Sequence, residues 1–249
     1  MLILLPPSET KSDGGDGPPL ELDRLSWPEL NGARKELADD LVALAADLPA
    51  SRTALGVSAR QDSEIARNAV LWTSPTAPAL RRYTGVLYDA LDYPSLRGAS
   101  AARAAARLAV GSALFGLVRA EDPVPGYRLS AGSTLPGRAG LTTFWRPLLE
   151  PVLAGVDELV VDLRSGSYAA LGRVPGAVTV TVLNERPDGS RSVVSHFNKS
   201  HKGQVARLLA GSRAEPSDAR EVVRLLRRAG MHIEASGPGG ATLELVLPA

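Results

Sequence analysis

Short runs of apolar residues, each followed at once by small or polar residues, predict the strands of this chain. Residues 2–5 (LILL) form the first run and end at Pro6-Pro7. Residues 159–163, 177–183 and 192–197 give three more runs, and a Pro-Asp-Gly turn joins the last two as a hairpin. A continuous apolar run of this length indicates a strand buried on both faces.

Longer stretches carry apolar residues at every third or fourth position and predict amphipathic helices. These helices cover residues 29–48, 58–72, 99–110, 143–153 and 220–229, and a last hairpin pairs 231–235 with 242–247 across a glycine-rich turn. No repeat and no linker follows residue 20. We therefore expect a single compact domain of the α/β class (mixed α+β) over residues 1–249, in which the Gly- and Pro-rich segment 12–20 is a flexible loop.

Composition narrows the possible chemistry. Of the 249 residues, 44% are hydrophobic, enough for a sizeable core. The chain has no cysteine and only three histidines, which argues against disulfides, a thiolate nucleophile and a Cys- or His-rich metal site. We predict no metal and no cofactor. The N-terminal apolar run is too short for a signal peptide or a membrane span, so we also predict a cytoplasmic protein without membrane contact.

The charge is nearly balanced overall but uneven along the chain. The net charge is +1, which argues against coating nucleic acid by bulk charge. Residues 81–138 nevertheless hold eight Arg against four acids, and residues 199–228 hold eight bases against three acids. If these two segments fold onto one face, they form a basic groove that can bind phosphates.

The stretch 195–209 (SHFNKSHKGQVARLL) concentrates side chains that contact anions. Asn198, Lys199, Ser200 and Lys202 lie within five positions, although only four of the 28 Lys+Arg residues are lysine. Lysine acts as a compact point charge on a phosphate, and its pKa shifts when it is buried. The stretch therefore predicts a phosphate or other anion site, with an ordinary solvated helix face as the alternative.

Two further loops place small polar groups just beyond an apolar strand, where α/β proteins commonly bind ligands. Ser8, Glu9, Thr10 and Lys11 follow the first strand, and residues 164–168 (RSGSY) follow the strand at 159–163. The first loop lacks the glycines and the GK[ST] spacing of a Walker loop. A simple turn with Glu9 and Lys11 exposed is the alternative.

Gly111 and Gly116 bracket an apolar segment, GSALFG. Glycines at this spacing between two helical pieces allow a tight hairpin whose backbone N–H groups approach a phosphate. A close helix crossing or a turn at an edge strand explains the same pattern.

Six blocks, taken in order, resemble the YaaA family of peroxide stress proteins, and they span nearly the whole chain. The blocks are PPSETK (6–11), YTGVLYDAL (83–91), GSALFGLVRAEDPVPGYRL (111–129), FWRPLL (144–149), VDLRSGSYAAL (161–171) and SHFNKSHKGQVARLL (195–209). The chain departs from the usual family pattern in the order of charges at Glu9 and Lys11 and in the spacing of Lys199 and Lys202.

The resemblance implies the compact mixed α/β fold of the family, with a helix-hairpin-helix-like element and a positively charged cleft. It also implies binding of double-stranded DNA and a role in limiting oxidative DNA damage, partly by restraining free iron. In this sequence the hairpin maps to Gly111 through Gly116 and the cleft to Lys199 and Lys202. The N-terminal loop matches by Ser8, Thr10 and Lys11.

Two functions remain open. In the first, a DNA-binding stress protein contacts phosphates through Lys199, Lys202, Arg119 and Arg128 and through the backbone of the glycine hairpin. Direct binding of iron is disfavoured because no ligand spacing supports it.

In the second function, an enzyme acts on a nucleotide or another phosphorylated small molecule where the loops after the strands converge. Lys11 or Lys199 is then an electrostatic clamp, Glu9 a base, Ser8 or Ser200 a hydrogen-bond donor, and Arg128 an anion contact.

Overall fold

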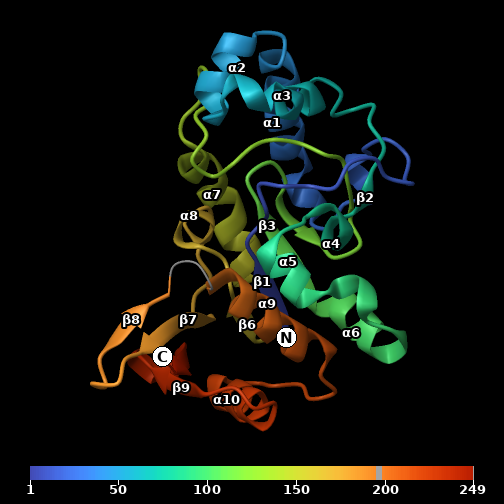
Figure 1. Cartoon of the computed structure of the whole chain (residues 1–249). Coiled ribbons are helices and arrows are strands. Elements are labelled where there is room, and N and C mark those ends of the chain that lie inside the picture. The colour runs from blue at the N-terminus through green and yellow to red at the C-terminus, as the bar shows by residue number, and fades with distance from the viewer. Residues whose placement is uncertain (195–197, 249) are drawn as a thin grey trace.

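The structure is a computed structural model that describes residues 1–194 and 198–248, and its centre is a mostly parallel β-sheet (Figure 1). The sheet runs in the order β4-β3-β1-β6-β7-β10-β9, with β8 paired to β7. The strands are β1 (Leu2–Leu5), β3 (Leu108–Ser112), β4 (Gly116–Arg119), β6 (Val160–Asp162), β7 (Val178–Glu185), β8 (Arg191–Val193), β9 (Ile233–Ser236) and β10 (Thr242–Pro248). A separate short pair joins β2 (Ala77–Pro78) to β5 (Pro123–Val124).

Strand β1 lies in the middle of the core because all four of its residues are apolar and fully buried. It pairs in parallel with β3 through Ile3 and Leu108, and with β6 through Ile3 and Val161. The predicted strands at 2–5, 159–163 and 177–183 all form. β1 and β6 are buried throughout, whereas β7 alternates between buried valines and the more exposed Thr179 and Thr181. The hairpins β7–β8 and β9–β10 are antiparallel, also as predicted.

The order of the parallel strands points to a location for ligands. The parallel strands follow one another along the chain as β1, β3, β6, β7 and β10. Across the sheet their order is β3-β1-β6-β7-β10, so only β1 and β3 are exchanged. In a sheet of this order the chain leaves β1 toward one side of the sheet and leaves β6 toward the other. Ligands bind in the crevice that forms between the carboxyl ends of these two neighbouring strands. We call the end where β1, β3 and β6 finish the carboxyl edge, and the end where they start the amino edge.

Helices surround the sheet, with α1, α2 and α3 at one end of the molecule and α10 at the other (Figure 1). They are α1 (Asn31–Leu44), α2 (Leu48–Leu55), α3 (Asp62–Ala69), α4 (Ala79–Arg82), α5 (Val86–Leu91), α6 (Gly98–Arg107), α7 (Leu141–Ala154), α8 (Gly166–Ala169), α9 (Asn198–Gly211) and α10 (Ala219–Arg228). Short 3-10 turns occupy Leu22–Arg24, Pro28–Leu30, Ala59–Gln61, Tyr93–Ser95 and Pro238–Gly240. Most of the predicted helices form with shifted ends.

The segment around Gly111 and Gly116 corrects the sequence prediction. It is the antiparallel hairpin β3–β4 at the edge of the sheet, so the predicted helix-hairpin-helix does not form there. The reason is burial, because Ala113, Leu114 and Phe115 are all fully enclosed and pack in the core. A turn at an edge strand, the alternative reading of the two glycines, describes the structure.

Several arginines of the basic segment 81–138 serve the fold. Arg82 donates to the carbonyls of Ser12 and Gly14 and so fastens part of the segment predicted to be a flexible loop. Arg107 donates to carbonyls of Leu209 and Ser212, which ties α6 to the end of α9. These guanidinium groups are buried, so the number of arginines in the segment overstates the charge at the surface.

Two further sequence predictions concern the strand at 192–197 and the membrane. The strand predicted over 192–197 corresponds to β8, and Ser195, His196 and Phe197 lie outside the described residues. Within residues 1–194 and 198–248, no helix has both the length and the apolar character needed to cross a membrane.

Candidate functional site

Lys11 lies in the loop that leaves β1, and it is buried, with 7% of the residue exposed. A β-bridge to Tyr83 fixes its backbone. Its Nζ donates to the Ser8 carbonyl at 3.0 Å and lies 4.2 Å from the centre of the Tyr127 ring and 5.5 Å from that of Tyr83. Since aromatic faces attract cations, a carbonyl oxygen and two rings hold the ammonium group.

Burial and, to a smaller extent, the positive charge of Arg128 lower the pKa of Lys11 to about 7, although Glu64 acts in the opposite direction. Near neutral pH the folded protein therefore contains both the ammonium form and the neutral amine. Shifts of this size cluster at functional sites. A lysine with such a pKa can take up and release a proton during a reaction.

The shifted pKa of Lys11 makes stability depend on pH. Its pKa is 10.5 in the unfolded chain and about 7 in the folded protein, so the unfolded chain binds more protons between these values. The free energy of unfolding therefore rises with pH, by about 3 kcal/mol between about pH 6 and pH 9. We expect this rise to disappear in Lys11→Met, which keeps the length of the side chain without its charge. Denaturant unfolding of both proteins measures it, and parallel pH profiles would contradict the burial of a titrating amine.

Arg128 lies next to Lys11 and is also buried. Its backbone is held on both sides by Asn68, which accepts from the Arg128 N–H at 2.7 Å and donates to the Arg128 carbonyl at 2.9 Å. Its guanidinium donates to the Glu9 carboxylate at 3.2 Å. Within residues 1–194 and 198–248, no hydrogen-bond partner is found for the buried Arg128 Nε.

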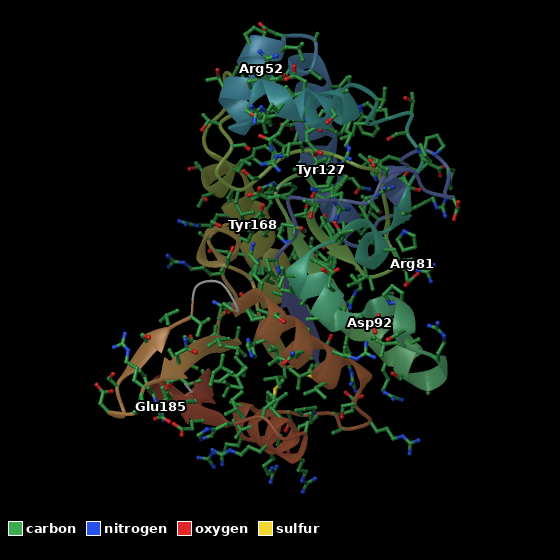
Figure 2. All side chains as sticks on the ribbon, in the orientation of Figure 1. Arg52, Arg81, Asp92, Tyr127, Tyr168 and Glu185 are labelled. Carbon is green, nitrogen blue, oxygen red and sulfur yellow. The ribbon has the colours of Figure 1, made fainter. Side chains whose placement is uncertain are left out.

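The loop after β6 reaches the same edge. Asp162 and Arg164 form a buried ion pair with bonds of 2.7 and 2.9 Å. In α8, which follows this loop, the Tyr168 hydroxyl accepts from the backbone N–H of Ala131 at 3.3 Å. Burial raises the pKa of Tyr168, and the charges of Glu9 and Arg128 act on this pKa in opposite directions. Figure 2 labels Tyr127 and Tyr168 in the middle of the molecule. We call Glu9, Lys11, Tyr127, Arg128 and Tyr168 the strand-end site.

A chain of buried hydroxyl groups lies beside Lys11. Tyr127 exchanges hydrogen bonds of 2.8 Å with both Tyr83 and Ser112. Burial raises the pKa of Tyr83 to about 12 and that of Tyr127 well above its usual value, so both remain protonated at neutral pH. Sequence patterns did not point to these hydroxyls, although Tyr83 and Tyr127 each stand beside an arginine, in RRY and GYR.

The predicted anion stretch in α9 is divided between surface and interior. Lys199 is exposed, and Asn198 and Ser200 are half-buried. Lys202 turns inward and donates to the carbonyl of Leu163 at 3.2 Å. Burial lowers the pKa of Lys202, while Asp162 acts in the opposite direction, so Lys202 belongs to the carboxyl edge.

Gly203, in the middle of this stretch, has a packing role. A Cβ there would lie 2.2 Å from the carbonyl oxygen of Leu87 in α5. The glycine thus allows α5 and α9 to cross closely, and no anion contact is needed to explain it.

The remaining predicted residues lie elsewhere. Gly111 and Gly116 are in the core, where a Cβ on Gly111 would lie 2.7 Å from Arg164 and one on Gly116 2.8 Å from Trp145. Arg119 pairs with Ala109 near the start of β3, so it stands toward the amino edge, away from Lys202 and Arg128.

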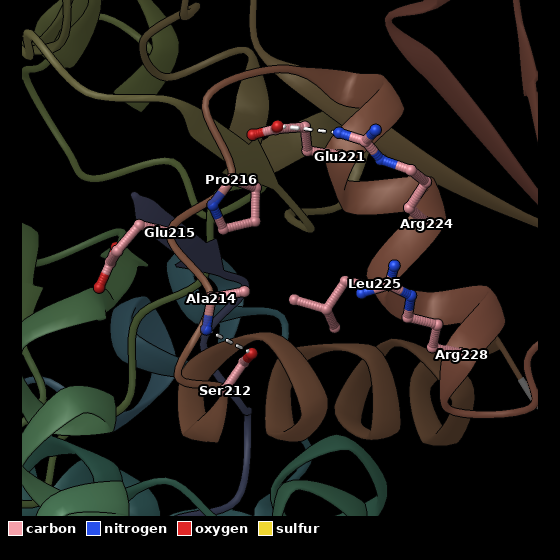
Figure 3. A pocket seen from close by; sticks show the side chains of 8 residues that line it. All are labelled: Ser212, Ala214, Glu215, Pro216, Glu221, Arg224, Leu225 and Arg228. Atoms are coloured by element: carbon pink, nitrogen blue, oxygen red, sulfur yellow. Dashed lines mark hydrogen bonds and ion pairs between the residues drawn. The ribbon is translucent and has the colours of Figure 1, made fainter.

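A second cluster of cations lies at the amino edge. Arg103 and Arg119 line a hollow of about 520 Å³ beside Met1. Arg224 and Arg228 line a neighbouring hollow of about 500 Å³ on α10 (Figure 3). Glu215 lines both hollows, so they adjoin. We call these four arginines the arginine surface.

Comparison with known proteins gives consistent relatives along the whole chain. The family described as "Peroxide stress protein YaaA" matches residues 1–235. A UPF0246 protein of Corynebacterium efficiens is 52% identical over 253 residues, covering 99% of this chain and 100% of the relative. A UPF0246 protein of Corynebacterium glutamicum is 47% identical over 251 residues, covering 99% and 100%. One of Streptomyces coelicolor is 45% identical over 246 residues, covering 96% and 94%.

Proposed function

This chain belongs to the family of the peroxide stress protein YaaA, and from that premise we propose that it acts in the response to peroxide stress by binding double-stranded DNA through its phosphates. The observation that carries the proposal is the arginine surface. Arg103 and Arg119 come from one basic segment of the sequence, and Arg224 and Arg228 come from the other. Guanidinium groups bind phosphate oxygens through two parallel hydrogen bonds, and they do so without reading the base sequence.

The exposed face of α10 adds to this support. Arg220, Arg224 and Arg228 are spaced four residues apart and are exposed, so they follow one another along the same side of the helix. Glu221 pairs with Arg224 at 2.8 Å, but it does so at the surface, where such a pair is weak and gives way to a polyanion.

Fluorescence anisotropy with a short DNA duplex, at low and at physiological salt, tests the proposal. We expect binding that weakens steeply with salt, and a slope of log K against log salt that falls by about 2 in Arg224→Ala/Arg228→Ala. Lys199→Ala/Lys202→Ala is the matched variant, since it removes two cations from the other edge and should bind nearly as wild type. Loss of binding only in the lysine variant would move DNA to the carboxyl edge. No binding at low salt would refute DNA as the ligand.

A second function is favoured by a specific observation at the carboxyl edge. Lys11 and Arg128, both buried, stand at the point where β1 and β6 part. Buried cations at such a switch point suit a phosphorylated small molecule, such as a nucleotide, better than a duplex. In this function Arg128 contacts the anion, Lys11 stabilises its charge or moves a proton, and Lys202 lies at the border of the site.

A further inference from the structure

Arg128 has the features of a preorganised anion-binding residue. Asn68 holds its backbone through two hydrogen bonds, so the side chain starts from a fixed point. The guanidinium is buried, and its Nε has no hydrogen-bond partner within residues 1–194 and 198–248. A buried donor without an acceptor is unfavourable. Arg128 therefore has capacity for one more acceptor than the described protein supplies.

The acceptor that Arg128 does have is weakly held. Glu9 receives a single bond of 3.2 Å from the terminal Nη2 of Arg128, and the Glu9 side chain is 70% exposed. An exposed carboxylate loses little when it returns to water. Glu9 also lies in the loop after β1, beside Ser8 and Thr10, whose hydroxyls share a bond of 3.1 Å. A carboxylate on this loop can leave without disturbing the sheet.

The charges around Arg128 favour an anion richer in charge than a carboxylate. Arg128 and Arg67 both lie close enough to Lys11 to lower its pKa, and Glu64 and Glu9 act in the opposite direction. Arg67 is already paired with Asp13 at 2.6 Å and with Glu64 at 3.3 Å. Displacing Glu9 removes the carboxylate that is bonded to Arg128, so Arg128 and the neighbouring Lys11 face the incoming anion. An incoming phosphoryl group, with its three acceptor oxygens, can use the arginine fork and the nearby amine together.

We propose that Arg128 is the receptor for a phosphoryl group of a small ligand, and that the Glu9 carboxylate occupies the place of this group until the ligand displaces it. This inference rests on the second candidate function, the phosphorylated small molecule at the carboxyl edge. Its distinctive consequence is that Glu9 competes with the ligand. A carboxylate that merely helped to build the site would, when removed, weaken binding or leave it unchanged.

Isothermal titration calorimetry with pyrophosphate as the probe tests the inference. Glu9→Gln keeps the shape of the side chain without its charge, and we expect it to bind pyrophosphate about fivefold more tightly than wild type. Glu21→Gln is the matched control, since it removes one exposed carboxylate elsewhere and should leave the affinity near that of wild type. Arg128→Lys keeps the charge but loses the fork, and we expect it to bind at least about tenfold more weakly.

The outcomes separate the receptor from the second function. If Glu9→Gln binds no more tightly than Glu21→Gln, or if Arg128→Lys binds as wild type, the receptor is refuted. Thermal unfolding of each variant shows whether it is folded, and the gain expected in Glu9→Gln cannot come from a folding defect. If ADP binds wild type and Arg128→Lys equally, the result supports a nucleotide ligand and refutes Arg128 as the phosphoryl receptor. If pyrophosphate binding depends on Arg128 but ADP does not bind, the result supports Arg128 as the phosphoryl receptor and refutes a nucleotide as the ligand.

Discussion

Asp162→Ala is expected to lower the free energy of unfolding by about 4 kcal/mol. Asp162 and Arg164 form a bidentate ion pair whose side chains are 8% and 1% exposed. Removing the carboxylate leaves the guanidinium charged and away from water, and arginine cannot release its proton to escape this cost. Arg164 retains its bond to the Gly172 carbonyl at 2.8 Å, which cannot neutralise its charge.

Denaturant unfolding measures the loss of stability in Asp162→Ala, and an ion pair at the surface provides the control. Arg52 and Asp62 also form a bidentate pair, with side chains that are 35% and 33% exposed. Because that pair is largely hydrated, Asp62→Ala should lower the free energy of unfolding much less than Asp162→Ala does. Similar losses in the two variants would mean that Arg164 gains access to water when Asp162 is removed. A large loss only at Asp162 would establish the buried pair as a main support of the carboxyl edge.

Gly203→Ala is expected to destabilise the protein by about 3 kcal/mol, the second of the large effects. The added methyl group would lie 2.2 Å from the Leu87 carbonyl oxygen and 2.9 Å from the Ala90 side chain. Since the first of these is backbone, no side-chain rotation relieves the overlap, and α5 and α9 must move apart. Alanine forms helices better than glycine, so any loss comes from the packing.

A second glycine within a helix supplies the matched control. Gly32 lies in α1, and a Cβ there would meet nothing within 4 Å. Gly32→Ala should therefore stabilise the protein by about 0.5 to 1 kcal/mol, through helix propensity and a less flexible unfolded chain. Thermal and denaturant unfolding of the two variants should give changes of opposite sign. A stabilising Gly203→Ala would show that α5 and α9 do not cross as closely as described.

The two candidate ligand surfaces lie at opposite edges of one sheet. The strand-end site follows the carboxyl ends of β1 and β6, and the arginine surface lies beside Met1 at the amino ends. A small ligand and a DNA duplex therefore need not compete for the same residues. Variants of Arg128 should change phosphate binding without changing DNA binding, and variants of Arg224 and Arg228 should do the reverse.

Local sequence patterns were enough to predict most of the helices and strands and the two loops that form the candidate site at the carboxyl edge. The run at 2–5 is apolar throughout, so it forms a strand wherever it is buried, and the turn residues at 187–189 fix the hairpin β7–β8. The loops 8–11 and 164–168 each follow a strand, and parallel strands finish at the same edge. Their convergence near Tyr168 therefore follows from order along the chain, whereas Arg128 was predicted as an anion contact from the basic segment 81–138.

What the sequence alone did not decide is which polar groups are buried and what encloses them. Gly111 to Gly116 satisfies the pattern of a helical hairpin and of an edge hairpin equally, and only the neighbouring strand β1 selects the second. The low pKa of Lys11 likewise depends on its burial and on Arg128, which is distant in sequence, as are the rings of Tyr83 and Tyr127 that lie against its ammonium group. Local pattern specifies conformation through short-range sterics and turn chemistry, but desolvation and charge pairing depend on contacts between remote segments, which only the tertiary structure creates.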